Sequence, residues 1–314
     1  MLPDSPFHAG ELAAQARAGV AARGAGIRSF MPDQHRIFFG QLPWLFAGVL
    51  DQSGWPLATA LSGPIGFAAS PDPTSLAIAA LPQSDDPAFD AIRPGSAIGL
   101  LGLEFETRRR NRANGQIETV DDKGVTVSVA QSFGNCAKYI QARTRLPDGG
   151  EQPQAVQTLA RLDGAAQALI AASDTLFIAS AAVAGTPGGG VDVSHRGGRP
   201  GFIRIDGDTL TVPDFIGNNY FNTLGNLLEE HRAAILLVDF ETGTMLQLQG
   251  LVEIIWDGPE LAGLEGSQRL WRFHVTRGWR SSHALPLRWT APDYAPTTLQ
   301  TGIWTGSRAS VAAA

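Results

Sequence analysis

The sequence predicts a β-rich α+β fold built from two copies of the same small barrel. Short apolar runs typical of buried strands recur along the chain. The 36 glycines and 20 prolines among 314 residues supply the many turns that such strands require. The order of these runs repeats after residue 150, and self-similarity of this kind indicates a repeated structural unit. Strands do not alternate with long helices, so a parallel doubly wound sheet is not expected.

Composition narrows the class of protein. A hydrophobic content of 44% with 17% charged residues is typical of a packed globular chain. The net charge of -6 argues against a dedicated nucleic-acid binder. Cys136 is the only cysteine, which excludes an intramolecular disulfide and an all-cysteine metal site and fits a reducing compartment. With no apolar run of membrane length, we expect a cytoplasmic protein with neither membrane nor nucleic acid as a partner.

A helix is expected near the amino terminus. Ser5 is a suitable N-cap, and Pro6 suits the first helical position. The apolar spacing predicts an inward face formed by Leu12, Ala13, Ala16 and Val20.

The repeat divides the chain into a first copy with leading helices (1–150), a second copy (151–290) and a tail (291–314). Four pairs of segments carry the match. They are WLFAGVL at 44–50 with TLFIASAAV at 175–183, WPLATALSGPIGF at 55–67 with VDVSHRGGRPGF at 191–202, AIGLLGLEFET at 97–107 with AAILLVDFETG at 233–243, and RRNRANGQIE at 109–118 with LQLQGLVEI at 246–254.

Two other stretches allow more than one interpretation. GTPGGG at 185–190 looks like a dinucleotide-binding loop, but predicted strands flank it and no helix follows. RRRNR at 108–112 is a charged strand edge, a contact to a phosphate or between the two copies, or a nucleic-acid patch.

Four motifs together resemble the pyridoxamine 5'-phosphate oxidase-like family of FMN-binding split barrels. They are RRRNRANG, QSFGNCAKYIQAR, DVSHRGGRPGF and DFIGNNYFNTLGNLL. The similarity spans roughly residues 28–290 and is greatest to members with two barrels in one chain. It implies two tandem split β-barrels with peripheral helices that pair as an intramolecular pseudo-dimer. The chain itself is then a monomer or a homodimer.

The resemblance implies one FMN site, with the phosphate held by the second copy. Hydroxyl, amide and guanidinium donors beside a helix start suit a phosphate. The implied residues are Ser194, His195, Arg196, Gly197, Phe202, Asn218, Asn219, Asn222 and Thr223. In the first copy Thr59, Ala60 and Leu61 stand at the positions of Ser194, His195 and Arg196, so the charged donor is missing there.

The resemblance also assigns residues that cover the flavin. They are Ser132, Asn135, Lys138 and Tyr139, while Gln249 lies on a strand that faces the phosphate in the family. Gln247 shares a strand face with Gln249, so both contribute or neither does. Cys136 is a buried small side chain or, alternatively, a redox thiol. His195 is a hydrogen-bonded or solvent-facing histidine or, alternatively, a catalytic acid.

The sequence departs from the family at two positions and assigns no catalytic residue. Asn219 stands where relatives often have arginine, and Ala137 where they often have proline. The other histidines are scattered without metal-ligand spacing, so no metal site is expected.

Three functions follow from the resemblance. The first is an FMN-dependent oxidoreductase that takes electrons from NAD(P)H or a partner reductase. The second is a flavin-binding carrier or sensor without turnover, and the third is a degenerate barrel that binds no flavin.

Overall fold

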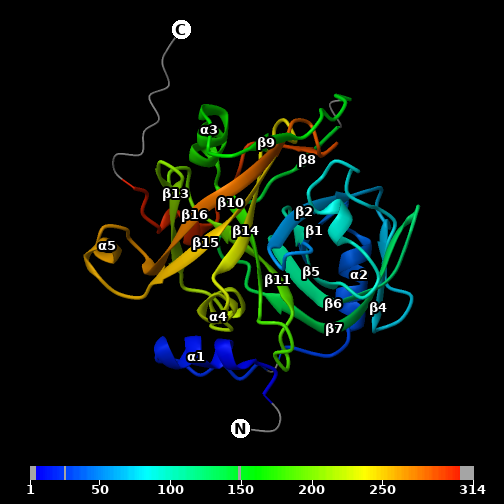
Figure 1. The fold of residues 1–314 in the computed structure, drawn as a ribbon, viewed down its shortest axis with the longest axis horizontal. Helices are drawn as coiled ribbons and strands as arrows, with labels where there is room; N and C mark the ends of the chain where they lie inside the picture. The colour runs from blue at the N-terminus through cyan, green and yellow to red at the C-terminus, as the bar shows by residue number, and fades with distance from the viewer. Residues whose placement is uncertain (1–4, 25, 148–149, 305–314) are drawn as a thin grey trace. The chain divides into compact units, whose positions relative to one another are not determined.

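The computed structural model describes residues 5–24, 26–147 and 150–304, and its main elements are two large β-sheets (Figure 1). The first sheet has seven strands in the order β2-β1-β5-β6-β7-β4-β3. They are β1 (Trp44–Leu50), β2 (Pro56–Ser62), β3 (Ala68–Ala69), β4 (Ser75–Ile78), β5 (Ala97–Glu104), β6 (Arg109–Asp121) and β7 (Gly124–Asn135).

The second sheet has eight strands, and its main path β11-β10-β14-β15-β16-β13-β12 repeats the order of the first. Its strands are β10 (Thr175–Ala181), β11 (Val191–Gly197), β12 (Arg204–Asp206), β13 (Thr209–Phe215), β14 (Arg232–Val238), β15 (Met245–Ile255), β16 (Ser267–Ser281) and, beside β16, β9 (Gln157–Leu159). A further pair consists of β8 (Arg145–Leu146) and β17 (Arg288–Trp289). The predicted β-rich fold class is confirmed, and corresponding strands occupy corresponding places in both sheets.

The two sheets also share an irregularity. The pairing of β6 with β7 shifts at a β-bulge between Asn114 and Gly115, and the pairing of β15 with β16 shifts between Gln249 and Gly250. A bulge re-aims the side chains beside it, so it is a structural feature rather than a defect. Its recurrence aligns Asn114 with Gln249.

Six helices accompany the sheets in the described residues. They are α1 (Ala9–Arg17), α2 (Asp33–Gly40), α3 (Gly164–Ala172), α4 (Asn222–Glu229), α5 (Pro259–Ala262) and α6 (Pro296–Leu299), with one 3-10 turn at Phe89–Ala91. None of these helices has both the length and the apolar character that crossing a membrane requires.

The amino-terminal helix differs from its prediction. It begins at Ala9, not at Pro6, because the side chain of His8 caps it and Glu11 completes a capping box. Leu12 is 42% exposed, so the predicted apolar face is wrong. The buried face consists of Gly10, Glu11, Ala14 and Gln15.

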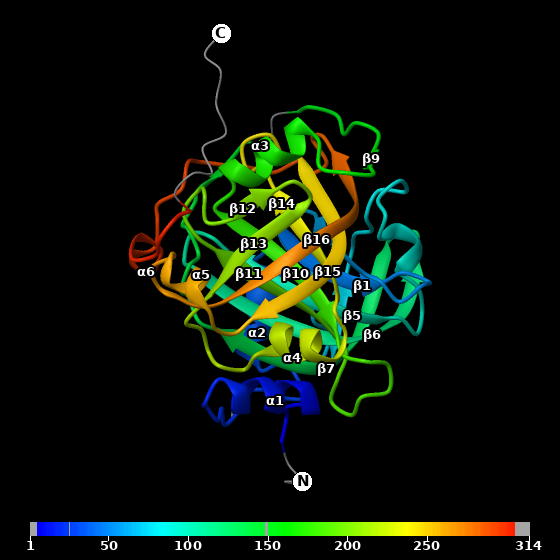
Figure 2. The same ribbon diagram turned by 60° about the vertical axis from the view of Figure 1, so that its left-hand side comes forward.

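This face contacts α4, and both views show the two helices side by side (Figures 1 and 2). A Cβ at Gly10 would lie 2.3 Å from the carbonyl oxygen of Gly225, and one at Gly225 would lie 2.6 Å from Cα of Glu11. Glycines therefore lie where the two helices come closest, because any side chain there would overlap the facing backbone.

The chain forms two compact units. The first consists of Met1–Ala137, Ile178–Ser194 and Gly217–Ala234, and the second of Lys138–Phe177, His195–Ile216 and Ile235–Ala314. The predicted boundaries at residues 150 and 290 and the pairing of the copies as a pseudo-dimer stay predictions. Within the predicted boundary and tail, residues 148–149 and 305–314 lie outside the described part of the chain.

Replacing Gly225 by alanine should destabilise the protein by about 1–3 kcal/mol, because the new methyl group overlaps the α1 backbone. Urea unfolding of the whole chain measures this loss. Gly164→Ala is the matched control, since a Cβ on that helical glycine meets nothing within 4 Å. We expect the control to be neutral or slightly stabilising. Equal effects of the two substitutions would contradict the close α1–α4 contact.

Candidate functional site

The first unit contains a buried ion pair. Arg112 of β6 donates from Nη1 to Oδ1 of Asp192 on β11 across 2.9 Å, and the two residues are 5% and 7% exposed. The approach of β11 depends on Gly99 of β5, where a Cβ would lie 2.4 Å from the carbonyl oxygen of Val191. Gly99 pairs with Asn114 on β6, so the same approach brings Asp192 to Asn114. Burial lowers the pKa of Arg112, and Asp192 opposes that shift.

Polar side chains extend this ion pair in two directions. Asn114 donates from Nδ2 to Oδ1 of Asp192 across 2.7 Å. Nη2 of Arg112 donates to Oγ of Ser194, which also accepts from the hydroxyl of Thr223 across 2.7 Å. Asp192 and Ser194 share a face of β11 because they are two residues apart. The structure therefore brings the predicted site residues Ser194 and Thr223 together, but around an ion pair.

Glu11 of α1 lies beside the first residue of α4, Asn222. Its Oε1 accepts from Nδ2 of Asn222, and its Oε2 accepts from the His8 amide across 2.9 Å. Burial, followed by the negative charge of Asp192, raises the pKa of Glu11 to about 8, although both hydrogen bonds favour the ionised form. Glu11 is therefore a proton donor and acceptor near neutral pH.

The side chain of His8 is buried beside Glu11. Burial lowers its pKa, so the neutral imidazole is favoured. Nδ1 accepts from the Gly10 amide across 3.2 Å, which assigns the proton of the neutral ring to Nε2.

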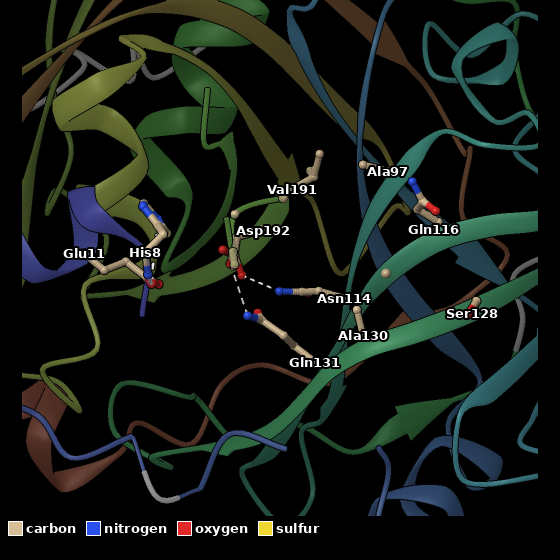
Figure 3. A pocket seen from close by; sticks show the side chains of 14 residues that line it. His8, Glu11, Ala97, Asn114, Gln116, Ser128, Ala130, Gln131, Val191 and Asp192 are labelled. Atoms are coloured by element: carbon tan, nitrogen blue, oxygen red, sulfur yellow. Dashed lines mark hydrogen bonds and ion pairs between the residues drawn. The ribbon is translucent and has the colours of Figure 1, made fainter. Parts of the chain in front are cut away.

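A cavity of about 440 Å³ opens beside these groups. Figure 3 shows His8 and Glu11 on one side of it, Asp192 near its middle and Asn114 reaching toward Asp192 from β6. Its lining consists of His8, Glu11, Ala97, Asn114, Gly115, Gln116, Ser128, Ala130, Gln131, Gly188, Gly189, Gly190, Val191 and Asp192.

The other predicted residues of the first unit are engaged locally. The hydroxyl of Ser132 donates to the carbonyl oxygen of Arg112 across 3.0 Å. Nδ2 of the exposed Asn218 donates to Oδ1 of Asn135 across 3.4 Å. Asn219 has a left-handed backbone with φ 62°.

In the second unit, Arg196 pairs with a carboxylate. Its Nη2 lies 3.7 Å from Oδ1 of Asp214 on β13, and Asp214 also accepts from Nε of Arg269 across 3.0 Å. His195 is buried rather than solvent-facing, with its ring edge-on to Phe177.

The remaining predicted residues of the second unit are half-buried or buried. Lys138 is half-buried, and the hydroxyl of Tyr139 donates to the Ile216 carbonyl across 3.2 Å. Gln249, like Gln247, is buried, and its Oε1 accepts from Nε of Arg277. Gly197 and Phe202 are buried, and Phe202 packs against Gly198.

The two ambiguous stretches and the cysteine are now placed. Arg112 is buried and β6 lies between β5 and β7, so a solvated strand edge is the wrong interpretation of that arginine. Strands β10 and β11 flank GTPGGG as predicted, and Gly188 to Gly190 line the cavity. Cys136 is unpaired and half-buried rather than fully buried.

Comparison with known proteins bears on the second half of the chain. The model of the pyridoxamine 5'-phosphate oxidase family matches residues 162–286. The resemblance to this family is confirmed over these residues. No curated protein matches the chain.

Several solved structures are similar to parts of the chain. A protein of the pyridoxinephosphate oxidase family from Clostridium acetobutylicum is 14% identical, with 40% of this chain and 91% of that chain covered and a TM-score of 0.27. An FAD-binding protein from Mesorhizobium loti is 11% identical, with 41% and 99% covered and a TM-score of 0.28. The heme storage protein HutZ from Vibrio cholerae is 13% identical, with 39% and 95% covered and a TM-score of 0.27.

FMN, which the family resemblance implies, needs unpaired donors for a phosphate with nearly two negative charges. In the first unit Ser194 and Thr223 already bond to protein groups, Asn222 bonds to Glu11, and Asp192 neutralises Arg112. In the second unit Arg196 lies beside Asp214. The residues present therefore do not fit the phosphate of FMN.

Sequence reasoning missed His8, Glu11 and Asp192 and did not assign Asn114. The repeat contained a usable signal, because setting Gly250 against Gly115 aligns Gln247 and Gln249 with Arg112 and Asn114. No comparable signal identified Glu11, whose burial depends on contact with a segment 211 residues away.

Replacing Glu11 by glutamine should remove a pH dependence of stability. The folded-state pKa of Glu11 lies above the ordinary value of 4.5. Its contribution to stability is therefore fully present below about pH 4.5 and is lost as pH rises to about 8. The wild type should lose at most about 5 kcal/mol over that range from this group.

Urea unfolding at three pH values measures this effect as the difference between wild type and Glu11→Gln. The exposed Glu118→Gln is the control and should follow the wild type. Parallel curves for wild type and Glu11→Gln would show that Glu11 ionises normally.

Replacing Arg112 by methionine should cost about 3–5 kcal/mol, because it leaves the Asp192 carboxylate buried without a counter-charge. Adding Asp192→Asn should recover part of this loss, since the remaining buried group is then neutral. Urea unfolding of both single variants and the double variant gives the coupling energy. A loss in the double variant equal to the sum of the two single losses would contradict the ion pair.

Proposed function

We propose that this chain is a small-molecule-binding protein on a split-barrel scaffold, and that its ligand occupies the cavity of the first unit without an FMN phosphate. The observation that carries this proposal is the pairing of Arg112 with Asp192 beside the cavity. This pairing removes the positive charge that a phosphate would require. Above about pH 8 the ionised carboxyl of Glu11 also repels an anion.

The cavity suits a small organic ligand in other respects. A volume of about 440 Å³ lies in the range of small-molecule sites, roughly 300–1,000 Å³. Its lining combines apolar walls with a few convergent polar groups. A carboxyl group with a strongly raised pKa inside a cavity is characteristic of binding and catalytic sites. Glu11 could therefore exchange a proton with a bound molecule.

An FMN-dependent oxidoreductase is the second candidate, and the family match over residues 162–286 favours it. In that case the flavin takes electrons from NAD(P)H or a partner reductase. Arg196 would then have to exchange its contact with Asp214 for the phosphate.

The purified full chain should lack flavin absorbance and should not quench the fluorescence of added FMN at concentrations up to about 100 µM. A yellow protein that NADH or NADPH bleaches would overturn the first candidate and support the second. Under the second candidate, Arg196→Ala should release FMN, whereas Arg161→Ala, which removes an exposed ion pair, should not.

A further inference from the structure

Two residues that line the cavity, Asn114 and Asp192, carry hydrogen-bond acceptors. Oδ1 of Asn114 is buried without a hydrogen-bond partner, and the residue is 7% exposed. Arg112 and Asn114 both donate to Oδ1 of Asp192, so neither of these bonds occupies Oδ2. Asn114 and Asp192 lie close together, joined by the hydrogen bond in Figure 3. A ligand that donates hydrogen bonds would satisfy both acceptors at once.

The charge of the lining points in the same direction. Its acidic side chains are Glu11 and Asp192, and no lysine or arginine is among the lining residues. Arg112 contacts Asp192 directly and is the smallest of the influences on the pKa of Glu11. An ionised Glu11 therefore has no arginine or lysine in direct contact, and a bound cation would supply a closer counter-charge.

The rest of the lining favours an organic body. Ala97, Ala130 and Val191 contribute apolar surface, and the volume of about 440 Å³ far exceeds that of a single ion. We propose that the cavity binds a small organic cation whose primary ammonium group donates to Asp192 and Asn114, with Glu11 as the second negative charge. This inference rests on the proposed function, since it assigns a chemical class to the ligand of the same cavity.

Cation binding in this cavity is coupled to the proton on Glu11. The groups that face Glu11 are His8, which caps its helix, Asp192 from β11, Arg112 from β6 and Asn222 from α4. Glu229 of α4 acts on His8. A bound ammonium group favours ionised Glu11 and so expels its proton. Affinity should therefore rise with pH up to about pH 8, where Glu11 is ionised in the free protein as well.

Isothermal titration of the full chain with three indole compounds tests the charge class. Tryptamine carries an ammonium group, tryptophol a hydroxyl and indole-3-acetate a carboxylate on the same ring. We expect tryptamine to bind roughly 10- to 100-fold more tightly than tryptophol, and indole-3-acetate to bind more weakly than either. Tryptamine should also release protons at neutral pH, measured as a dependence of the binding heat on the buffer.

Two variants locate the site. Asp192→Asn should lower tryptamine affinity by about tenfold or more, while the exposed Asp90→Asn should leave it unchanged. Because Asp192→Asn also leaves Arg112 unpaired, Glu11→Gln provides a second test. It should weaken tryptamine binding and abolish its rise with pH.

Each alternative outcome overturns a defined part of the inference. Equal affinities for tryptamine and tryptophol would overturn the preference for a cation but leave the proposed small-molecule binding in place. Preference for indole-3-acetate, absence of any binding, or displacement of tryptamine by magnesium or calcium chloride would overturn the organic-cation class. Displacement of tryptamine by FMN would show that the proposed function itself is wrong.

Discussion

The ion pair between Arg112 and Asp192 is the constraint on which the polar interior of the first unit depends. Two buried charges are tolerated only when each satisfies the other, because desolvation of either alone costs several kcal/mol, about 3–5 when a partner is removed. Here the carboxylate also accepts from Asn114, and Oγ of Ser194 accepts from both the guanidinium of Arg112 and the hydroxyl of Thr223. The absence of a Cβ at Gly99 makes this possible, since it lets β11 come close to β5. A backbone contact thus sets the charge pattern of the site.

A second backbone contact sets the acidity of Glu11. Helix α4 begins after Phe221 in a left-handed conformation and has no side-chain cap of its own. The carboxyl group of Glu11 bonds instead to the side chain of its first residue, Asn222. Gly10 and Gly225 let the helices come so close that Glu11 is only 3% exposed. Its raised pKa is therefore a consequence of helix packing and of Asp192 rather than of any sequence motif.

These two contacts explain which features could be predicted from the sequence. Strands such as β1 and β10 are nearly continuous apolar runs, and their order repeats, so local pattern and self-similarity were enough to predict the sheets. The inner face of α1 was missed because glycine and glutamate form it, whereas apolar spacing favours Leu12. The partnership of Arg112 with Asp192 joins positions 80 residues apart, and no local period encodes it. Only the alignment of the copies, which equates Arg112 with Gln247, pointed to that strand position.

The stretch DVSHRGG shows that hydrogen-bond donors in a motif do not by themselves predict an anion site, because neighbouring acidic residues can occupy them. Strand alternation places Asp192, Ser194 and Arg196 on one face, so the apparent anion-binding set contains an acid. That acid neutralises Arg112, and Asp214 lies beside Arg196, so both arginines already have carboxylate neighbours. In the first copy the matching Thr59 is buried and donates to Asp86 across 2.7 Å. Acidic partners thus accompany the donors in both copies, and the electrostatic character of the cavity follows from the carboxyl groups that line it.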